Sequence, residues 1–215
     1  ARLSIYPDGG VSRLRLSDES RTKRMLRELH AVPLTAERFA PFGQVIEDAR
    51  IAEASMNDTR FERFDDLCDV DTDGSTAISI ARCRTPTSLP YRVDVVERHP
   101  LGSQAFIPLD GQAFVVVVAK PGAAPDAAAL EAFVSNGRQG INYSRGTWHM
   151  PLIGLAGGQR FLVIDNDRST ETRLETDVRT LAEPGDRIAG GARWRAARDR
   201  LAVAAGLCYP AGLLV

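Results

Sequence analysis

Residues 97–119 are ERHPLGSQAFIPLDGQAFVVVVA, a stretch with two apolar runs on either side of a turn. The runs are Ser103–Pro108 and Ala113–Ala119, and the turn is Leu109-Asp110-Gly111. Short runs rich in valine, isoleucine and phenylalanine that end at glycine or proline are typical of buried β-strands. Two further runs have the same character, Thr76–Ala81 and Phe161–Ile164. Several such strands predict a mainly β domain, a sandwich or a barrel, between about residues 45 and 167.

Only a few short helices are expected around these strands. Capping residues and apolar spacing predict helices over residues 18–30, from Thr35 to Gly43, and over residues 126–134. In the last of these, Leu130, Phe133 and Val134 are expected to face inward. Residues 1–16 are expected to form a short strand pair. After Asp167 the β signal fades, and residues 190–205 could form a helix rich in arginine and alanine.

Length and composition bound the class of protein. The chain has 215 residues, of which 44% are apolar and 26% charged, which suits one globular domain with extensions. We expect an N-terminal extension at 1–30, a main domain at 31–168 and a C-terminal tail of unknown role at 169–215. A net charge of −1 points to neither nucleic acid nor an anionic membrane as a partner. The longest apolar run is far too short to cross a bilayer.

Cysteine usage indicates the compartment. Cys68, Cys83 and Cys208 are widely spaced and form no CxxC pair, so a cysteine zinc site is not expected. An odd number of cysteines without a disulfide framework suits a reducing cytoplasm. The first residues also lack the basic segment and apolar core of a signal peptide. We therefore expect a cytoplasmic protein.

Glu97 and His99 open the stretch quoted above and stand at alternate positions, so they would project from one face of a strand. A carboxylate beside an imidazole suits acid–base chemistry or a metal site. The spacing from Glu97-x-His99 to Gln104 and Gly111 fits the ligand spacing of cupin metal sites. In this register Glu97 replaces a histidine and Gln104 replaces a glutamate. A later Gly-x-x-His, ending at His149, fits the last ligand of such sites.

The spacing therefore predicts that a barrel brings Glu97, His99, Gln104 and His149 together, as catalytic groups or as ligands of one divalent metal ion. Because glutamine is a poor metal ligand, Gln104 favours a weakly bound metal or none. The alternative is a structural role. His99 precedes a proline, and such a residue often only ends an extended segment.

Two other polar clusters are candidates for substrate binding. Asn142-Tyr143-Ser144-Arg145 offers an amide, a phenol, a hydroxyl and a guanidinium. The other cluster contains Asn57, Arg60, Glu62 and Arg63, and Arg82 follows an apolar run. The alternative for the first cluster is a polar surface loop, and for the second a solvated strand face.

With these residues in hand, the chain resembles the ureidoglycolate lyase family from about Pro33 to Asp165. The motifs that carry the resemblance are Phe39–Ile46, Asn57 with Phe61–Phe64, Glu97–Pro108, Phe114–Ala119, Gly140–Tyr143, Gly146–His149 and Phe161–Asp165. Related members often have histidines where Ser144 and Met150 stand here, which leaves His149 as the one histidine of its motif. The resemblance implies a cupin-like double-stranded β-barrel with a few short helices, usually a homodimer. It also implies the cleavage of ureidoglycolate to glyoxylate and urea in allantoin breakdown.

This reaction suggests a role for each candidate residue. His99 or His149 would be the base, with Glu97 tuning its partner. A cation must hold the substrate carboxylate, and Arg63 or Arg82 suits this role. The amide and hydroxyl of the substrate would be bound by Gln104, Asn142 and Tyr143, and Asn57 is a further candidate.

Residues 1–16 carry a separate resemblance to the closing strands of an allantoicase domain. Allantoicase produces ureidoglycolate, so a fusion or functional pairing with allantoicase is a further expectation. Two other functions stay open at this point. One is a different cupin-type metal-dependent enzyme, and the other is a non-catalytic fusion partner that binds a small molecule.

Overall fold

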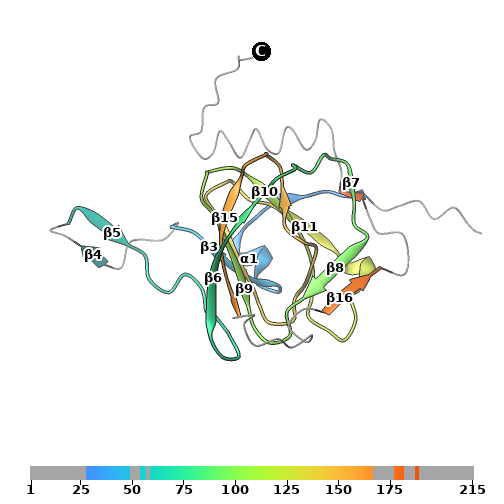
Figure 1. Cartoon of the computed structure of the whole chain (residues 1–215), viewed down its shortest axis with the longest axis horizontal. Helices are drawn as coiled ribbons and strands as arrows, with labels where there is room; N and C mark the ends of the chain where they lie inside the picture. The colour runs from blue at the N-terminus through green and yellow to red at the C-terminus, as the bar shows by residue number, and fades with distance from the viewer. Residues whose placement is uncertain (1–27, 49–53, 57–58, 167–176, 182–186, 189–215) are drawn as a thin grey trace, which may run out of the picture.

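The protein consists mainly of two β-sheets that face each other and enclose a core (Figure 1). The structure, a computed structural model, describes residues 28–48, 54–56, 59–166, 177–181 and 187–188.

The larger sheet is built around β10, which the valine-rich run forms and which is buried along its whole length. Its order is β16-β8-β13-β10-β11-β2, and β14 also pairs with β10. The strand bounds are β2 Val32–Pro33, β8 Val95–Arg98, β10 Phe114–Ala119, β11 Glu131–Val134, β13 Trp148–His149, β14 Ile153–Gly154 and β16 Asp177–Thr180.

The smaller facing sheet has the order β3-β12-β9-β15-β6. Its strands are β3 Gly43–Ile46, β6 Thr76–Arg82, β9 Gln104–Pro108, β12 Gly140–Tyr143 and β15 Arg160–Asn166. The helix α1, Ala36–Phe39, leads into β3 and begins at Thr35, whose side chain accepts a hydrogen bond from the backbone N–H of Arg38. β3 lies so close to β12 that a Cβ at Gly43 would overlap the carbonyl oxygen of Asn142.

Two small sheets lie outside this pair. β1 (Glu28–Leu29), β17 (Arg187–Ile188) and β7 (Tyr91–Arg92) form one, in the order β1-β17-β7. β4 (Ala54–Met56) and β5 (Phe61–Arg63) form a hairpin that stands away from the body of the molecule (Figure 1).

Alternation along β10 divides the core into two layers. Phe114, Val116 and Val118 point between the two main sheets and pack with aromatic residues of the smaller sheet. Val115, Val117 and Ala119 point to the opposite face, where the small sheet β1-β17-β7 contributes Leu29 and Ile188. Both faces of the larger sheet are therefore covered, which explains why β10 has no polar residue.

The mainly β, cupin-like fold expected from the sequence is confirmed, and strands occupy all four apolar runs. The helix expected to start at Thr35 is present but ends at Phe39. The division into three segments stays a prediction. None of the helices in the described part of the chain is long and apolar enough to cross a membrane.

The helix predicted over residues 126–134 is wrong. Asp126 does cap a turn, but this is a short 3-10 helix, η1 (Ala127–Ala129), after which β11 begins. Leu130, Phe133 and Val134 are buried as expected, although Phe133 and Val134 belong to the strand. Their helix-like spacing was outweighed by backbone pairing with β10.

Two other predictions need correction near the ends of the chain. Glu28 and Leu29 form β1 and not the end of a helix, while the rest of that predicted helix and the strand pair at 1–16 lie outside the described residues. The β signal does not fade after Asp167, because β16 pairs with β8 and β17 pairs with β7. The helix predicted over 190–205 lies outside the described residues.

Candidate active site

Glu97 and His149 are directly opposite each other in the ladder between β8 and β13. Opposed residues of an antiparallel pair share a face. His149 is also opposite Val118, so this face is the one that looks toward the core between the main sheets. The Nε2 atom of His149 is 3.6 Å from Oε1 of Glu97, and the histidine side chain is 2% exposed. This separation is too long for a direct hydrogen bond and suits a bridging ligand atom.

The other ring nitrogen of His149 fixes its tautomer. Nδ1 lies 3.0 Å from the carbonyl oxygen of Thr147, and a carbonyl can only accept. Nδ1 therefore carries the proton, and in the neutral ring Nε2 presents a lone pair toward Glu97. This is the state that a general base or a metal ligand requires.

His99 lies beside this pair. It follows the last residue of β8, and its ring centroid is 5.3 Å from that of His149 with the planes inclined by 33°. The backbone N–H of Gly146 donates to the carbonyl of His99 at 2.9 Å. The two motifs singled out in the sequence are thus joined by backbone as well as by side chains.

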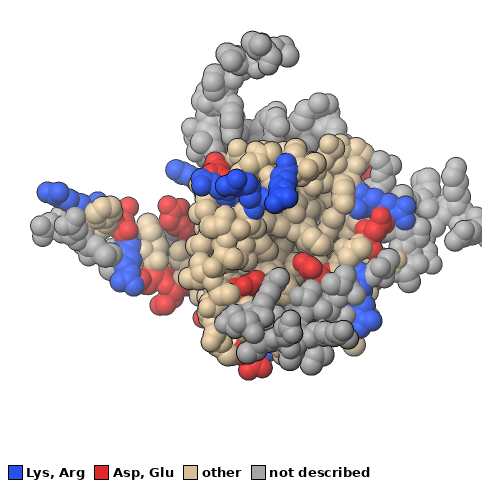
Figure 2. Space-filling model, in the orientation of Figure 1, with Lys and Arg blue, Asp and Glu red and all other residues tan. Residues whose placement is uncertain are grey.

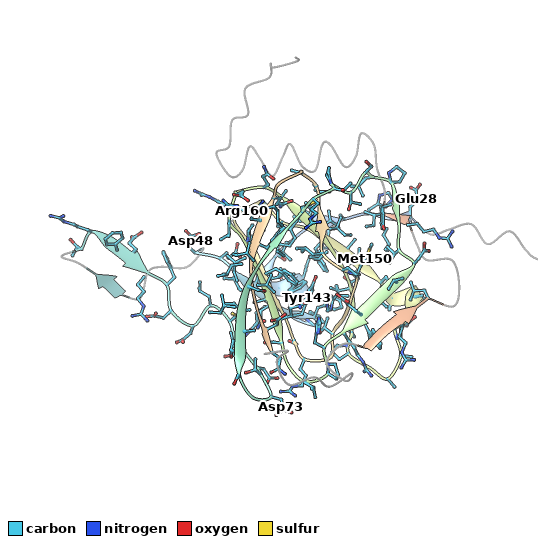
Figure 3. The ribbon with its side chains drawn as sticks, in the orientation of Figure 1. Glu28, Asp48, Asp73, Tyr143, Met150 and Arg160 are labelled. Atoms are coloured by element: carbon cyan, nitrogen blue, oxygen red, sulfur yellow. The ribbon has the colours of Figure 1, made fainter. Side chains whose placement is uncertain are left out.

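Tyr143 reaches the site from the facing sheet and lies near the centre of the molecule (Figure 3). Its ring stacks on that of His149 with centroids 4.1 Å apart. Burial, and secondarily the charge of Glu97, raises the pKa of Tyr143 far above its usual value. Its buried hydroxyl has no hydrogen-bond partner among the described residues. The phenol therefore stays protonated and has a hydrogen bond to donate.

Gln104 lies opposite Tyr143 in the ladder between β9 and β12, so its side chain shares the inner face. Its Nε2 donates to Oδ2 of Asp165 at 3.2 Å in a buried contact. This bond orients the amide of Gln104. A carboxylate can only accept hydrogen bonds, so it pairs with the NH2 end of the amide and not with its oxygen. The Oε1 atom of Gln104, also buried, is left without a hydrogen-bond partner in the described part of the chain.

The cluster also has the composition of a metal site. Glu97, His99 and His149 each offer one ligand atom, and these atoms all lie within 4.8 Å of one another. Two imidazoles and one carboxylate are a common donor set for divalent transition metals. The Nδ1–H contact of His149 with a backbone carbonyl is the kind that orients ligating histidines.

Of the predicted metal set, Glu97, His99 and His149 come together, and Tyr143 stacks on His149 beside them. Gln104 lies on the inner face of the facing sheet, opposite Tyr143. Asn142 does not join them, since adjacent residues of a strand point to opposite faces. Its Nδ2 donates to the carbonyl oxygen of Asp69 at 2.8 Å and to Oε1 of Gln44 at 3.3 Å. Asn142 therefore ties the segment around Asp69 to the outer face of the smaller sheet.

The two predicted carboxylate-binding arginines also lie apart from this cluster in the same chain. Arg63 is on the protruding hairpin, and its Nε is 2.6 Å from Oδ1 of Asp65. Arg82 is exposed at the end of β6, opposite Arg160. Asn57 lies outside the described residues.

The structure also places the two positions, Ser144 and Met150, where related members of the family often have histidines. Met150 follows His149 and packs in the layer on the other face of the larger sheet, whereas Ser144 is exposed. Neither position points at the cluster beside Tyr143. His149 alone therefore supplies the imidazole from this motif.

Sequence reasoning missed two residues that position the cluster. Thr147 acts through its backbone carbonyl, which no side-chain pattern reveals. Asp165 was detectable, because it alternates with Phe161 and Val163, both buried in the core between the sheets. A carboxylate at an inward position of a buried strand is unusual unless it is paired or hydrogen-bonded.

A cupin-like β fold that places a buried imidazole and a buried phenol beside a half-buried imidazole and carboxylate belongs to an enzyme class equipped for acid–base or metal-assisted chemistry on a small polar molecule. The ureidoglycolate lyase family model matches residues 26–184. The chain belongs to the ureidoglycolate lyase family.

Individual relatives agree with this family. A ureidoglycolate lyase of Pseudomonas syringae pv. tomato is 43% identical over 166 residues, which cover 74% of this chain and 97% of the relative. One from Pseudomonas fluorescens SBW25 is also 43% identical over 166 residues, 74% of this chain and 99% of the relative. One from Pseudomonas syringae pv. syringae is 46% identical over 143 residues, 65% of this chain and 84% of the relative.

Proposed function

We propose that this chain is a lyase that cleaves (S)-ureidoglycolate into glyoxylate and urea. Membership of the ureidoglycolate lyase family supports the substrate and the reaction. The observation that carries the chemistry is the state of His149: Nδ1–H is held by the Thr147 carbonyl, while Nε2 faces Glu97 inside the fold.

In ureidoglycolate one carbon carries the hydroxyl, the ureido nitrogen and the carboxylate. His149 Nε2 takes the hydroxyl proton, the C–O bond becomes a carbonyl, and the C–N bond breaks with its electron pair going to nitrogen. Because hydroxyl and nitrogen share one carbon, the same imidazolium can return the proton to the departing urea. Glu97, 3.6 Å from Nε2, stabilises the imidazolium between the two transfers. The proton balance is closed, and no other reactant is needed.

Tyr143 and Gln104 bind the substrate in this proposal. The phenol donates a hydrogen bond to the oxygen that becomes the carbonyl of glyoxylate, where negative charge develops. Oε1 of Gln104 accepts from a urea N–H, because the bond to Asp165 turns that oxygen away from the carboxylate. His99, beside His149, completes the wall of the site.

A divalent metal ion fits the same residues, and Glu97, His99 and His149 would hold it. Such an ion, when bound, polarises the substrate hydroxyl and lowers its pKa. His149 would then be a ligand of the ion and not the base. A chelator should abolish activity if His149 is a metal ligand and leave it unchanged if His149 is the base.

The test is turnover of racemic ureidoglycolate by the purified chain, with glyoxylate, urea and ammonia all measured. We expect equal amounts of glyoxylate and urea, with one enantiomer left over. Ammonia in place of urea would contradict the lyase reaction. Incubation with a chelator followed by readdition of single metal ions then assigns His149, since loss and recovery of activity identify a ligand and unchanged activity identifies a base.

The proposal includes a setting for the enzyme: a homodimer in the cytoplasm, paired or fused with allantoicase. The widely spaced cysteines support a reducing compartment, and Cys68 and Cys83 are free thiols. The resemblance of residues 1–16 to allantoicase supports the pairing. Coding sequence for an allantoicase domain directly upstream in the gene would establish a fusion.

A further inference from the structure

The hairpin of β4 and β5 stands off the body of the molecule as an arm (Figures 1 and 2). Its two strands pair with each other and with no other strand of the described sheets. An isolated two-stranded hairpin is at best marginally stable in water and needs a surface to pack against. The arm is therefore a segment that fits a partner better than it fits its own chain.

One face of the arm combines an apolar anchor with a cation. Phe61 and Arg63 alternate on β5 and so share a face, and Phe61 is 61% exposed. Arg63 pairs with Asp65 at the base of the hairpin. Glu62 points to the opposite face of β5, and Arg60 lies in the turn just before this strand. Aromatic residues and arginine are the types enriched in protein interfaces.

A second exposed apolar surface lies on β6, on the same side of the molecule as the arm (Figure 1). Ile78 and Ile80 are 71% and 56% exposed, although both belong to a regular strand. They are opposite Ile164 and Leu162 of β15, so the four side chains form one apolar strip on the outer face of the smaller sheet. A contiguous exposed strip of this kind marks an interaction surface.

The site itself shows why an outside arginine would matter. The substrate carboxylate needs a cation, and several arginines of the described body are already engaged, including Arg92, whose Nε is 2.6 Å from Oδ1 of Asp94. Arg98 lies over the Trp148 ring, Arg145 forms a double hydrogen bond with Asp71, and Arg160 does the same with Asp110. Arg63 also has a carboxylate partner, Asp65 at 2.6 Å, but its side chain is 58% exposed and lies on a projecting arm, so a substrate carboxylate can compete for it.

We propose that the apolar strip of β6 meets a second copy of this chain across a two-fold axis, and that each arm places Arg63 at the partner's active site to bind the substrate carboxylate. A two-fold interface is self-complementary, so both arms are used and both sites are completed. Phe61 is the anchor of the arm on the partner. The role of Arg63 rests on the proposed function, whereas the assembly does not.

The test of the shared site is complementation between two inactive chains. Arg63→Ala removes the cation and leaves the site intact, whereas His149→Ala removes the imidazole and leaves the arm intact. After co-expression or unfolding and refolding together, a mixed dimer contains one site with a native arm and a native imidazole. We expect activity to return to about a quarter of the wild-type value, since about half of the dimers are mixed and each has one good site. No recovery in proven mixed dimers would overturn the proposal.

Matched variants keep this test sharp. Arg60→Ala, in the turn before β5 on the same arm, should keep wild-type turnover, and a loss equal to that of Arg63→Ala would overturn the assignment to Arg63. Ile78→Asp and Phe61→Asp should convert the dimer to a monomer in light scattering. A wild-type chain that is monomeric overturns the arm proposal whatever its activity. A dimeric wild type that dissociates in these variants but never cleaves ureidoglycolate overturns the proposed function and supports the interface.

Discussion

Tyr143 and His149 stack ring on ring, with centroids 4.1 Å apart and planes inclined by only 16°. One ring comes from the smaller sheet and the other from the larger sheet. The contact therefore holds the imidazole plane by a residue from the facing layer, while the Thr147 carbonyl, just before β13, holds it from the same segment of the chain. Together they direct Nε2 toward Glu97, so the reactive geometry depends on the packing of the two sheets.

The Tyr143→Phe variant separates this stacking from the chemistry. The ring stays, but the hydroxyl that donates to the developing oxyanion is lost, and the loss of one such donor costs about 10²–10³-fold in kcat. Stability should hold or rise slightly, because the buried hydroxyl has no hydrogen-bond partner among the described residues. Steady-state kinetics and thermal unfolding measure the two effects. Wild-type turnover in the variant would remove the phenol from the mechanism.

The His149→Ala variant tests the imidazole. We expect turnover to fall by at least about 10²-fold, the lower end of what positioned acid–base groups contribute. Because the side chain is nearly buried, the variant leaves a cavity of imidazole size, and added imidazole should restore part of the rate in a saturable way. Circular dichroism serves as the control for folding. Near-normal turnover without imidazole would show that another group is the base.

Much of the fold and of the site could be predicted from the sequence, and the reason is local pattern. The valine-rich run predicts a buried strand from its residue types alone, and in the structure this run forms the buried strand β10. The two short motifs that supplied Glu97, His99 and His149 are far apart in the chain, but their residue types and spacing already suit one site. The ladder between β8 and β13 brings them together.

Two features depended on strand pairing: which of Asn142 and Tyr143 faces the site, and whether the segment from Leu130 to Val134 is helix or strand. Asn142 and Tyr143 are neighbours in the sequence, and only the pairing with β9 decides that Tyr143 shares the inner face with Gln104. The spacing of Leu130, Phe133 and Val134 suits a helix as well as a strand, and pairing with β10 decided between them. Such choices depend on long-range contacts, which a single sequence does not contain.

The Asn142→Ala variant tests the structural role that the register assigns. It removes the hydrogen bonds to the Asp69 carbonyl and to Gln44 on the outer face. We expect unfolding to require about 1–2 kcal/mol less free energy, as for the loss of a buried amide with its partners. The value of kcat should stay within about a factor of two of wild type, because the side chain points away from the imidazoles. Urea unfolding and kinetics check both, and a selective loss of kcat would restore Asn142 to the site.

The pair of Asp71 and Arg145 predicts a pH dependence of stability. The hydrogen bond from Arg145 holds the pKa of Asp71 below its ordinary value of 3.8. A carboxyl whose pKa is lower in the folded state stabilises the fold above its unfolded-state pKa and loses this effect as pH falls through the folded-state pKa. Asp71→Asn should therefore be less stable than wild type at pH 6, by less than about 1 kcal/mol because the pair is solvated. Urea unfolding should show the difference closing in acid, and a gap that stays constant down to pH 2.5 would contradict the assignment.

Asp165 acts through Gln104, and this predicts an effect on KM that differs from the effects of Tyr143 and His149. Its carboxylate accepts from Nε2 of Gln104 at 3.2 Å and so turns Oε1 toward the substrate. In Asp165→Asn the new amide can pair with either the nitrogen or the oxygen of the Gln104 side chain. Oε1 of Gln104 is then no longer fixed in the direction of the ureido group. We expect KM to rise by about tenfold, the factor that corresponds to roughly 1.4 kcal/mol of binding, with a smaller change in kcat. Gln104→Leu should show the same rise, and the double variant should show little more, because both changes remove one interaction. Additive effects in the double variant would mean that Asp165 serves the site by a route other than Gln104.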